Sequence, residues 1–184
     1  YRIYDLLGSR LPTRLELFTY MDSDIYDLCL KTSKENIFKN YLTFRQNLNL
    51  ISVDEQNLFN GVGREFLHLL ETTDMTKVYK MPVLNCFYNN GNIRLKLTKE
   101  DLLKSWKEFF DADMNWKDLG KEITYEEYKN INDNSHISNI LRNPVKFLKA
   151  SGKGFFTDES GFAIALNDSL KDCVNDAVFI REFN

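Results

Sequence analysis

Apolar side chains recur at helical spacing through residues 1–72 of the chain. Two stretches, 13–16 and 52–55, begin with threonine or serine and end with glutamate, which is the spacing of a capping box at a helix start. Apolar residues three or four positions apart follow each of them, so we expect Leu15 and Phe18 to face inward. This part of the chain therefore predicts a series of short helices.

A mixed pattern follows from residue 73 onward. Ile93, Leu95 and Leu97 alternate with basic residues, which predicts a short half-buried strand. Two apolar runs around an Asp-Glu-Ser-Gly turn predict a β-hairpin over residues 155–166. Between them, Thr98 opens the clearest amphipathic helix of the chain, whose apolar stripe is Leu102, Leu103, Trp106, Phe109 and Phe110.

The order of these elements predicts the architecture. Asn143 and Pro144 form a cap followed by proline at the first helical position, so a further helix is expected to start there, directly before the hairpin. Helix, strand, helix, helix and hairpin is the order in a winged helix, where the hairpin forms the wing and the preceding helix lies against nucleic acid. We predict a mostly α fold with a small β component, composed of a helical N-terminal subdomain (1–72) followed by a winged-helix-like subdomain (73–184).

Charge is segregated along the chain, although the net charge is only −3. Residues 75–99 and 134–157 contain no aspartate or glutamate, whereas the stretches around them are acidic. A local excess of lysine and arginine is what a phosphate-facing surface requires. The candidate nucleic-acid-binding residues are the cations of these two stretches and one tyrosine: Lys77, Tyr79, Lys80, Arg94, Lys96, Lys99, Arg142, Lys146, Lys149 and Lys153.

No catalytic constellation stands out among the remaining residues. Gly61 and Gly63 lack the third glycine and the preceding strand of a nucleotide-binding loop, so helix packing explains them better. The histidines and cysteines have no metal-ligand spacing. Glu127 and Lys129 have the Glu-x-Lys form of some nucleases, but their flanks predict a solvated helix instead of a buried strand. We expect no catalytic residue, no metal site and no cofactor in this chain.

The cysteines and the hydropathy pattern bear on the cellular compartment. Cys29, Cys86 and Cys173 are odd in number, far apart and set among apolar residues, which favours reduced thiols in a reducing compartment. No apolar run approaches about 18 residues, the length that a membrane span requires. The chain starts at Tyr1 and ends without a polar tail. We therefore expect a cytoplasmic piece of a longer protein, with no membrane partner.

Residues 6–13, Leu-Leu-Gly-Ser-Arg-Leu-Pro-Thr, together with Tyr-Leu-Thr-Phe at 41–44, resemble a segment beyond the motor of bacterial superfamily II helicases of the DEAD/DEAH type. Residues 74–84 and 143–148 look like the C-terminal portion of the same helicases, of the kind found in restriction-like or phage-defence loci. The resemblance implies a non-catalytic C-terminal accessory region of an ATP-dependent helicase. ATP and magnesium would then be bound only by the motor of the parent chain, which would be the hydrolase.

Two hypotheses from different classes fit these observations. As a helicase accessory region, the chain would grip duplex or forked DNA beside the motor, through backbone contacts with little base readout. As a protein-interaction or autoregulatory module, it would dock on the motor or on a partner through its aromatic-rich helices. The DNA hypothesis requires that the two acid-free stretches form one face of the folded protein.

Overall fold

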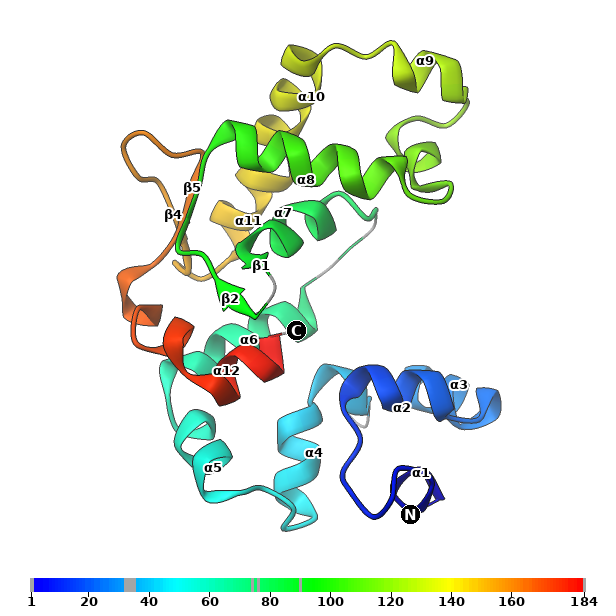
Figure 1. Cartoon of the computed structure of the whole chain (residues 1–184), viewed down its shortest axis with the longest axis vertical. Coiled ribbons are helices and arrows are strands. Elements are labelled where there is room, and N and C mark those ends of the chain that lie inside the picture. Colours follow the sequence, from blue (N-terminus) through cyan, green and yellow to red (C-terminus); the bar gives the residue numbers. More distant parts are fainter. Residues whose placement is uncertain (1, 32–35, 74, 76, 90, 184) are drawn as a thin grey trace.

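The computed structural model describes residues 2–31, 36–73, 75, 77–89 and 91–183 (Figure 1). Helices dominate, and the strands are few and short, so the predicted mostly α fold with a small β component is confirmed. Asp74 and Thr76, which belong to one of the helicase-like stretches, lie outside the described residues.

The first part of the chain is a series of short helices, as predicted. The capping boxes at Thr13 and Ser52 are both formed, because each side chain accepts a hydrogen bond from the backbone N–H of the glutamate three residues on, which accepts one in return. The elements are α1 (Arg2–Leu6), α2 (Arg14–Tyr20), α3 (Ser23–Lys31), the 3-10 turn η1 (Ile37–Lys39), α4 (Tyr41–Asn47), α5 (Val53–Phe59) and α6 (Val62–Thr72).

The register of α2 differs from the predicted one. Leu15 is 72% exposed and Phe18 is 57% exposed, whereas Leu17 is the buried side chain. Arg14 explains the difference because it reaches Glu71 of α6, with 2.7 Å between Arg14 Nη2 and Glu71 Oε1. Residues three apart share one face of a helix, so this ion pair turns Arg14 and Leu17 inward and Leu15 outward.

The second part combines helices with two small sheets. The amphipathic helix predicted after Thr98 is α8, and Leu102, Trp106 and Phe110 of its stripe are buried. The elements are α7 (Lys80–Phe87), β1 (Tyr88–Asn89), β2 (Asn92–Ile93), β3 (Lys96–Leu97), α8 (Lys99–Asp111), η2 (Asn115–Leu119), α9 (Tyr125–Lys129), α10 (Asp133–Ile140), the π-helical turn η3 (Leu141–Val145), α11 (Lys146–Ser151), β4 (Phe156–Thr157), β5 (Ile164–Leu166), η4 (Asp168–Leu170), η5 (Cys173–Asn175) and α12 (Ala177–Phe183).

The larger sheet has three strands in the order β3-β5-β4, and both neighbouring pairs are antiparallel. Leu97 of β3 lies opposite Ile164 of β5, and Phe156 of β4 lies opposite Leu166 of β5. The hairpin predicted over residues 155–166 is therefore confirmed. It follows α11 directly and packs beside the strand that precedes α8.

The single strand predicted from the alternation of residues 93–97 is wrong. Ile93 pairs with Tyr88 in the β1–β2 hairpin, whereas Leu97 belongs to β3 and the larger sheet. The backbone N–H of Arg94 between them bonds to the carbonyl oxygen of Phe87. An alternation of apolar and polar residues indicates which side chains are buried. It does not indicate that the chain changes its pairing strand between Ile93 and Leu97.

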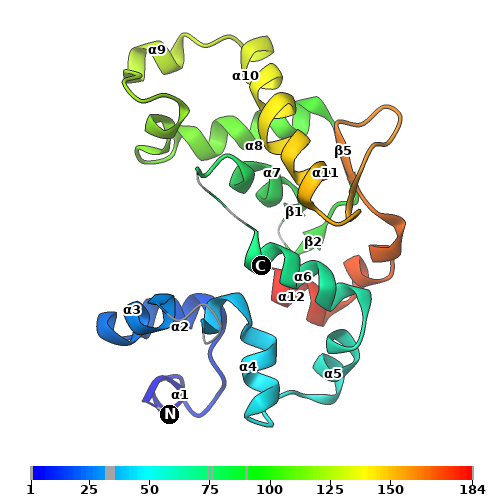
Figure 2. The same cartoon turned by 180° about the vertical axis from the view of Figure 1, so that it is seen from behind.

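One apolar core joins the two parts of the chain. Leu42 and Phe66 from the first part belong to the same cluster of buried side chains as Trp106 and Phe179 from the second. The last helix, α12, returns to pack against α5 and α6 (Figures 1 and 2). Residues on both sides of the predicted boundary at residue 72 thus contribute to one core.

Gly63 marks the place where α12 approaches α6. A Cβ atom added at Gly63 would lie 2.7 Å from Leu58 Cδ1 and 3.1 Å from the ring of Phe179. Both distances are shorter than ordinary van der Waals contact, so the absence of a side chain allows Phe179 to pack onto the helix. The packing interpretation of this glycine is confirmed.

Trp106 occupies the centre of the second part. Its side chain is 1% exposed, and its ring lies 4.5 Å from that of Phe110 and 5.9 Å from that of Tyr79 between centroids. Trp106 Nε1 donates a hydrogen bond to His136 Nδ1 at 3.2 Å. His136 is therefore turned toward the core, and the accepting Nδ1 belongs to a neutral imidazole.

Trp106→Ala should lower the free energy of unfolding by about 3–5 kcal/mol, because it removes a buried indole and leaves a cavity. Urea denaturation followed by circular dichroism measures the change. Lys104→Ala, on the exposed face of α8, is the matched control and should stay within about 0.5 kcal/mol of the unaltered protein. A Trp106→Ala protein as stable as this control would contradict the register of α8.

Protonation of His136 should destabilise the fold. Burial lowers the pKa of His136, and Lys107 adds to this effect against the opposing carboxylates of Asp133 and Asp111. The ordinary pKa in the unfolded chain is about 6.5, so on acidification the unfolded chain takes up the proton first. The stability that neutral His136 contributes is therefore complete above about pH 6.5 and is lost as the pH falls from there toward the folded pKa.

Thermal melts between about pH 8 and pH 5 should show this loss as a falling Tm. His136→Gln keeps an amide oxygen as acceptor for Trp106 but cannot titrate, so its Tm should fall less over the same range. His68→Gln replaces the other histidine of the chain and should keep most of the fall. Parallel curves for the unaltered protein and His136→Gln would contradict the assignment.

Candidate nucleic-acid interface

The candidate interface is built on one continuous helical segment, residues 133–151, formed by α10, η3 and α11. Asn132 caps it by accepting a hydrogen bond from the backbone N–H of Ser135. The helix start predicted at Asn143 and Pro144 is wrong, because Pro144 lies inside the segment, in the π-helical turn. Proline has no N–H to donate, and the wider turn accommodates its ring without ending the helix.

The outward face of this segment is basic, with one large apolar side chain, Phe147, 53% exposed beside the cations. Arg142 and Lys146 are exposed one helical turn apart, and Lys153 is exposed just past the end of α11. Among the residues that the structure describes, none of these three cations forms an ion pair. The opposite face is turned toward the core by the buried side chains His136, Ile140, Pro144, Val145 and Leu148.

Lys149 and Lys96 are engaged with the hairpin instead. Lys149 Nζ lies 2.5 Å from Asp158 Oδ1 and donates to the carbonyl oxygen of Ala163 at 3.0 Å. Lys96 Nζ lies 2.7 Å from Glu159 Oε1. One lysine comes from α11 and the other from β3, and both reach the hairpin, so they hold it in place. Their charges are already matched by its two acidic residues.

Arg94 and Lys99 flank the start of α8. Arg94 Nη2 lies 2.6 Å from Oδ2 of Asp101, the residue whose carboxylate also caps the helix. This hydrogen bond raises the pKa of Arg94 and lowers that of Asp101. Lys99 is exposed and borders a small recess that Ile137 and Leu141 also line. Lys99 therefore lies beside the segment that carries the exposed cations.

Lys77, Tyr79 and Lys80 are held by a different part of the molecule. The Lys77 ammonium and the Tyr79 hydroxyl both donate to the carbonyl oxygen of Asp118 in η2, at 2.7 and 2.6 Å. Lys80 Nζ donates to the Thr73 hydroxyl at 3.2 Å. Lys77 and Tyr79 thus secure the entry into α7 against η2, and Lys80 links the start of α7 to the end of α6.

The predicted cations fall into two groups at the two ends of α8. This helix contains 13 residues, so its ends are separated by about 20 Å. One end adjoins β3 and the hairpin, and the other adjoins η2 (Figure 1). The acid-free stretches therefore come together over residues 94–99 and 142–153, whereas residues 77–80 lie apart from them.

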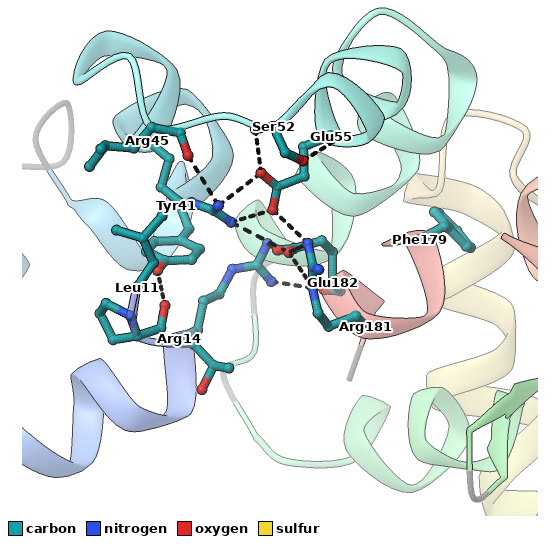
Figure 3. Close-up of polar contacts among 12 residues, drawn as sticks. Leu11, Arg14, Tyr41, Arg45, Ser52, Glu55, Phe179, Arg181 and Glu182 are labelled. Carbon is teal, nitrogen blue, oxygen red and sulfur yellow. Dashed lines mark hydrogen bonds and ion pairs between the residues drawn. The ribbon is translucent and has the colours of Figure 1, made fainter. Parts of the chain in front are cut away.

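An ion-pair cluster around the buried side chains of Arg45, Glu55 and Glu182 joins the N-terminal helices to α12, and no sequence pattern indicated it (Figure 3). Glu55 Oε1 lies 2.7 Å from Arg45 Nη1 and 2.5 Å from Arg181 Nη2. Glu182 lies 3.7 Å from Arg45 and 4.0 Å from Arg14. Arg14 and Glu182 are 168 positions apart in the chain, so no local spacing could have revealed this cluster.

The charge of Glu55 is stabilised inside the cluster. Burial opposes ionisation of Glu55, but the Ser52 backbone N–H and the Arg45 guanidinium outweigh burial and lower the pKa of the carboxyl group. The Tyr41 hydroxyl, whose pKa burial raises, donates to the carbonyl oxygen of Pro12. A cleft of about 430 Å³ adjoins these side chains. Because its charges are paired, the cluster has a structural role: it links α4 and α5 to α12, and we call it the structural joint.

The Glu-x-Lys pair noted in the sequence stabilises a short helix. Glu127 accepts hydrogen bonds from the backbone N–H and hydroxyl of Thr124, which caps α9 and lowers the pKa of Glu127. Lys129 Nζ lies 2.7 Å from Asp111 Oδ1. Over the described ranges, no group of three or more histidine, cysteine, aspartate or glutamate residues could hold a metal ion. In the same ranges, no helix has the length and apolar character that crossing a membrane requires.

Comparison with known proteins adds no constraint. No family model matches the chain, and neither a curated protein nor a solved structure matches it.

Glu55→Gln should destabilise the protein by up to about 3–5 kcal/mol, because it removes the nearer counter-charge of the buried Arg45 and leaves only Glu182, at 3.7 Å. Urea denaturation measures the change. Glu108→Gln is the control, since the pair of Glu108 with Lys104 is exposed, and should cost less than about 1 kcal/mol. An apolar replacement of both Arg45 and Glu55 should recover much of the loss. If Glu55→Gln were no more harmful than Glu108→Gln, the cluster would not be a structural joint.

Proposed function

We propose that this chain binds duplex or forked DNA along the outward face of residues 133–151, mainly through the phosphate backbone. The observation that carries the proposal is the charge on this face. Arg142, Lys146 and Lys153 are exposed, and Lys99 lies beside the segment. Backbone phosphates accept hydrogen bonds from arginine, lysine, serine and asparagine side chains. The same face supplies the exposed neutral donors Asn134, Ser135, Ser138 and Ser151.

The surrounding elements support this use of the segment. The order of the elements is that expected of a winged helix, in which the third helix faces nucleic acid. The elements concerned are α7, β3, α8, the helical segment and the β4–β5 hairpin. Residues 112–132, with η2 and α9, are an addition between the second and third helices. The hairpin carries Asp158 and Glu159, so the helix, and not the wing, supplies the positive charge in this proposal.

In the parent protein, the chain would act as the C-terminal accessory region of an ATP-dependent DNA helicase in the cytoplasm. The resemblance of residues 6–13 and 74–84 to DEAD/DEAH-type helicases supports this role. The motor of the same chain would bind ATP and magnesium and perform the hydrolysis. The region described here would hold DNA beside that motor, without base-specific contacts.

The number of exposed cations sets the strength of the interaction. Each neutralised phosphate of duplex DNA contributes about −0.9 to the slope of log K against log salt concentration. Four cations, Lys99, Arg142, Lys146 and Lys153, therefore correspond to a slope of about −3 to −4. Such binding is readily measured at low salt and is lost steeply as salt rises.

Replacing Arg142, Lys146 and Lys153 together by alanine should weaken DNA binding at least about tenfold at low salt and reduce the slope by about two to three units. Fluorescence anisotropy with single-stranded, duplex and forked DNA, at about 50 and 200 mM salt, measures both quantities. The loss should be similar for unrelated sequences, because phosphates carry no sequence information.

The matched control is the triple variant Lys104→Ala, Lys117→Ala and Lys121→Ala, which removes the same charge from exposed positions outside the proposed face. It should bind DNA within about twofold of the unaltered protein, with an unchanged slope. Circular-dichroism melts confirm that both variants fold. Absence of binding at low salt, or an equal loss in the control, would contradict the proposal.

A further inference from the structure

α2 and α3 carry large apolar side chains that are exposed to solvent. Phe18 is 57% exposed, Ile25 is 50% exposed and Leu28 is 64% exposed. Among the described residues from 2 to 31, Leu17 is the one buried side chain. Ile25 and Leu28 are three positions apart and so share one face of α3. An amphipathic helix normally turns such a face toward a packing partner.

The two helices adjoin each other through aromatic side chains. Phe18 of α2 meets Tyr26 of α3 with 5.4 Å between ring centroids, and both rings reach Phe38 of η1, at 6.4 and 5.5 Å. Helices of seven and nine residues gain most of their stability from tertiary packing. Phe18 remains more than half exposed despite these contacts, and Ile25 and Leu28 are exposed on α3. Exposed apolar side chains that gather on neighbouring elements are a mark of interaction sites.

Charge defines the chemistry of the partner. Asp24 and Asp27 lie next to Ile25 and Leu28 on α3 and are exposed. Within the part of the chain that the structure describes, neither forms an ion pair. Elsewhere in the same region, Asp22 pairs with Arg2 and Glu16 pairs with Arg10. The unmatched aspartates therefore favour a partner with lysine or arginine beside its apolar side chains.

We propose that the outer surface of α2 and α3, formed by Phe18, Asp24, Ile25, Asp27 and Leu28, docks a basic amphipathic helix of another protein. The apolar face of that helix covers Phe18, Ile25 and Leu28, and its cations lie opposite Asp24 and Asp27. Helical surfaces of this kind commonly accept a further helix through side chains at i, i+3 and i+4 spacing. This surface is separate from the proposed DNA-binding face.

The same aspartates disfavour the other possible occupants. A symmetric dimer formed through this surface would bring Asp24 and Asp27 of both copies into one interface without adding any cation to it. Nucleic acid and anionic lipid carry negative charge and are repelled for the same reason. A basic helix is the occupant that satisfies both the apolar and the acidic components of the surface.

The test uses the whole chain and two fluorescent peptides of about 18 residues, long enough for about five helical turns. Both peptides have leucine on one helical face, and one has lysine and the other glutamate at the flanking positions. Fluorescence anisotropy should show at least about tenfold tighter binding of the Leu/Lys peptide than of the Leu/Glu peptide. Leu28→Ser should weaken binding of the Leu/Lys peptide by about tenfold, because it removes a central apolar contact.

The charge exchange Asp24→Lys with Asp27→Lys should reverse the preference, weakening the Leu/Lys peptide and strengthening the Leu/Glu peptide. Asp168→Lys with Asp172→Lys makes the same change of net charge at exposed positions of η4 and the residues after it. This control should leave both affinities within about twofold. All substitutions are at exposed side chains, and circular-dichroism melts verify folding.

Several results would overturn the proposal. Equal binding of the two peptides, or an equal effect of the Asp168 and Asp172 control, would show that only net charge is sensed. A concentration-dependent dimer in light scattering that Leu28→Ser abolishes would identify a second copy as the occupant. Co-sedimentation with phosphatidylcholine/phosphatidylglycerol vesicles that depends on Leu28 would identify a lipid surface instead.

Discussion

The carboxylate of Glu55 is the constraint on which the arrangement of this chain depends. It closes the capping box that starts α5, and it pairs with Arg45 of α4 and Arg181 of α12. Arg45 also donates to the carbonyl oxygen of Leu50, which fixes the turn between α4 and α5. A buried charge is costly unless all its partners are present. The start of α5, the turn before it and the last helix are therefore secured together.

The two parts of the chain are attached to this joint by different forces. α12 inserts Phe179 against Phe66 and Gly63, so the second part is held by close apolar packing. The N-terminal helices are held by polar contacts, chiefly Arg14 with Glu71 of α6 and Tyr41 with the carbonyl oxygen of Pro12. Regions with few buried apolar contacts open at lower free energy than the core. The helices that expose apolar surface are thus the ones that can adjust to a partner.

Most features that depend on neighbours within four residues were predictable from the sequence, apart from the helix start predicted at Asn143 and Pro144. Features that depend on distant partners were not. The capping box at Ser52 and the stripe around Trp106 follow from local spacing, and both are confirmed. The facing of α2 was mispredicted because Arg14 pairs with a residue of α6. Counting charges located the basic stretches, but it could not show that Lys149 is engaged by the hairpin. The winged-helix assignment and the helicase role stay predictions.

The net charge of −3 is a sum over the whole chain. The two proposed surfaces differ in sign, because the face of residues 133–151 exposes cations and that of α2 and α3 exposes Asp24 and Asp27. Figures 1 and 2 show α6 and α12 between the N-terminal helices and the helical segment that carries Arg142 and Lys146. One layer of helix is about 10 Å thick, and the Debye length at physiological ionic strength is about 8 Å, so each surface is screened from the other. Each can select a partner by its own charge. Salt weakens a phosphate contact steeply, whereas it leaves apolar burial in place, so the surface on α2 and α3 would keep its partner under conditions that release DNA.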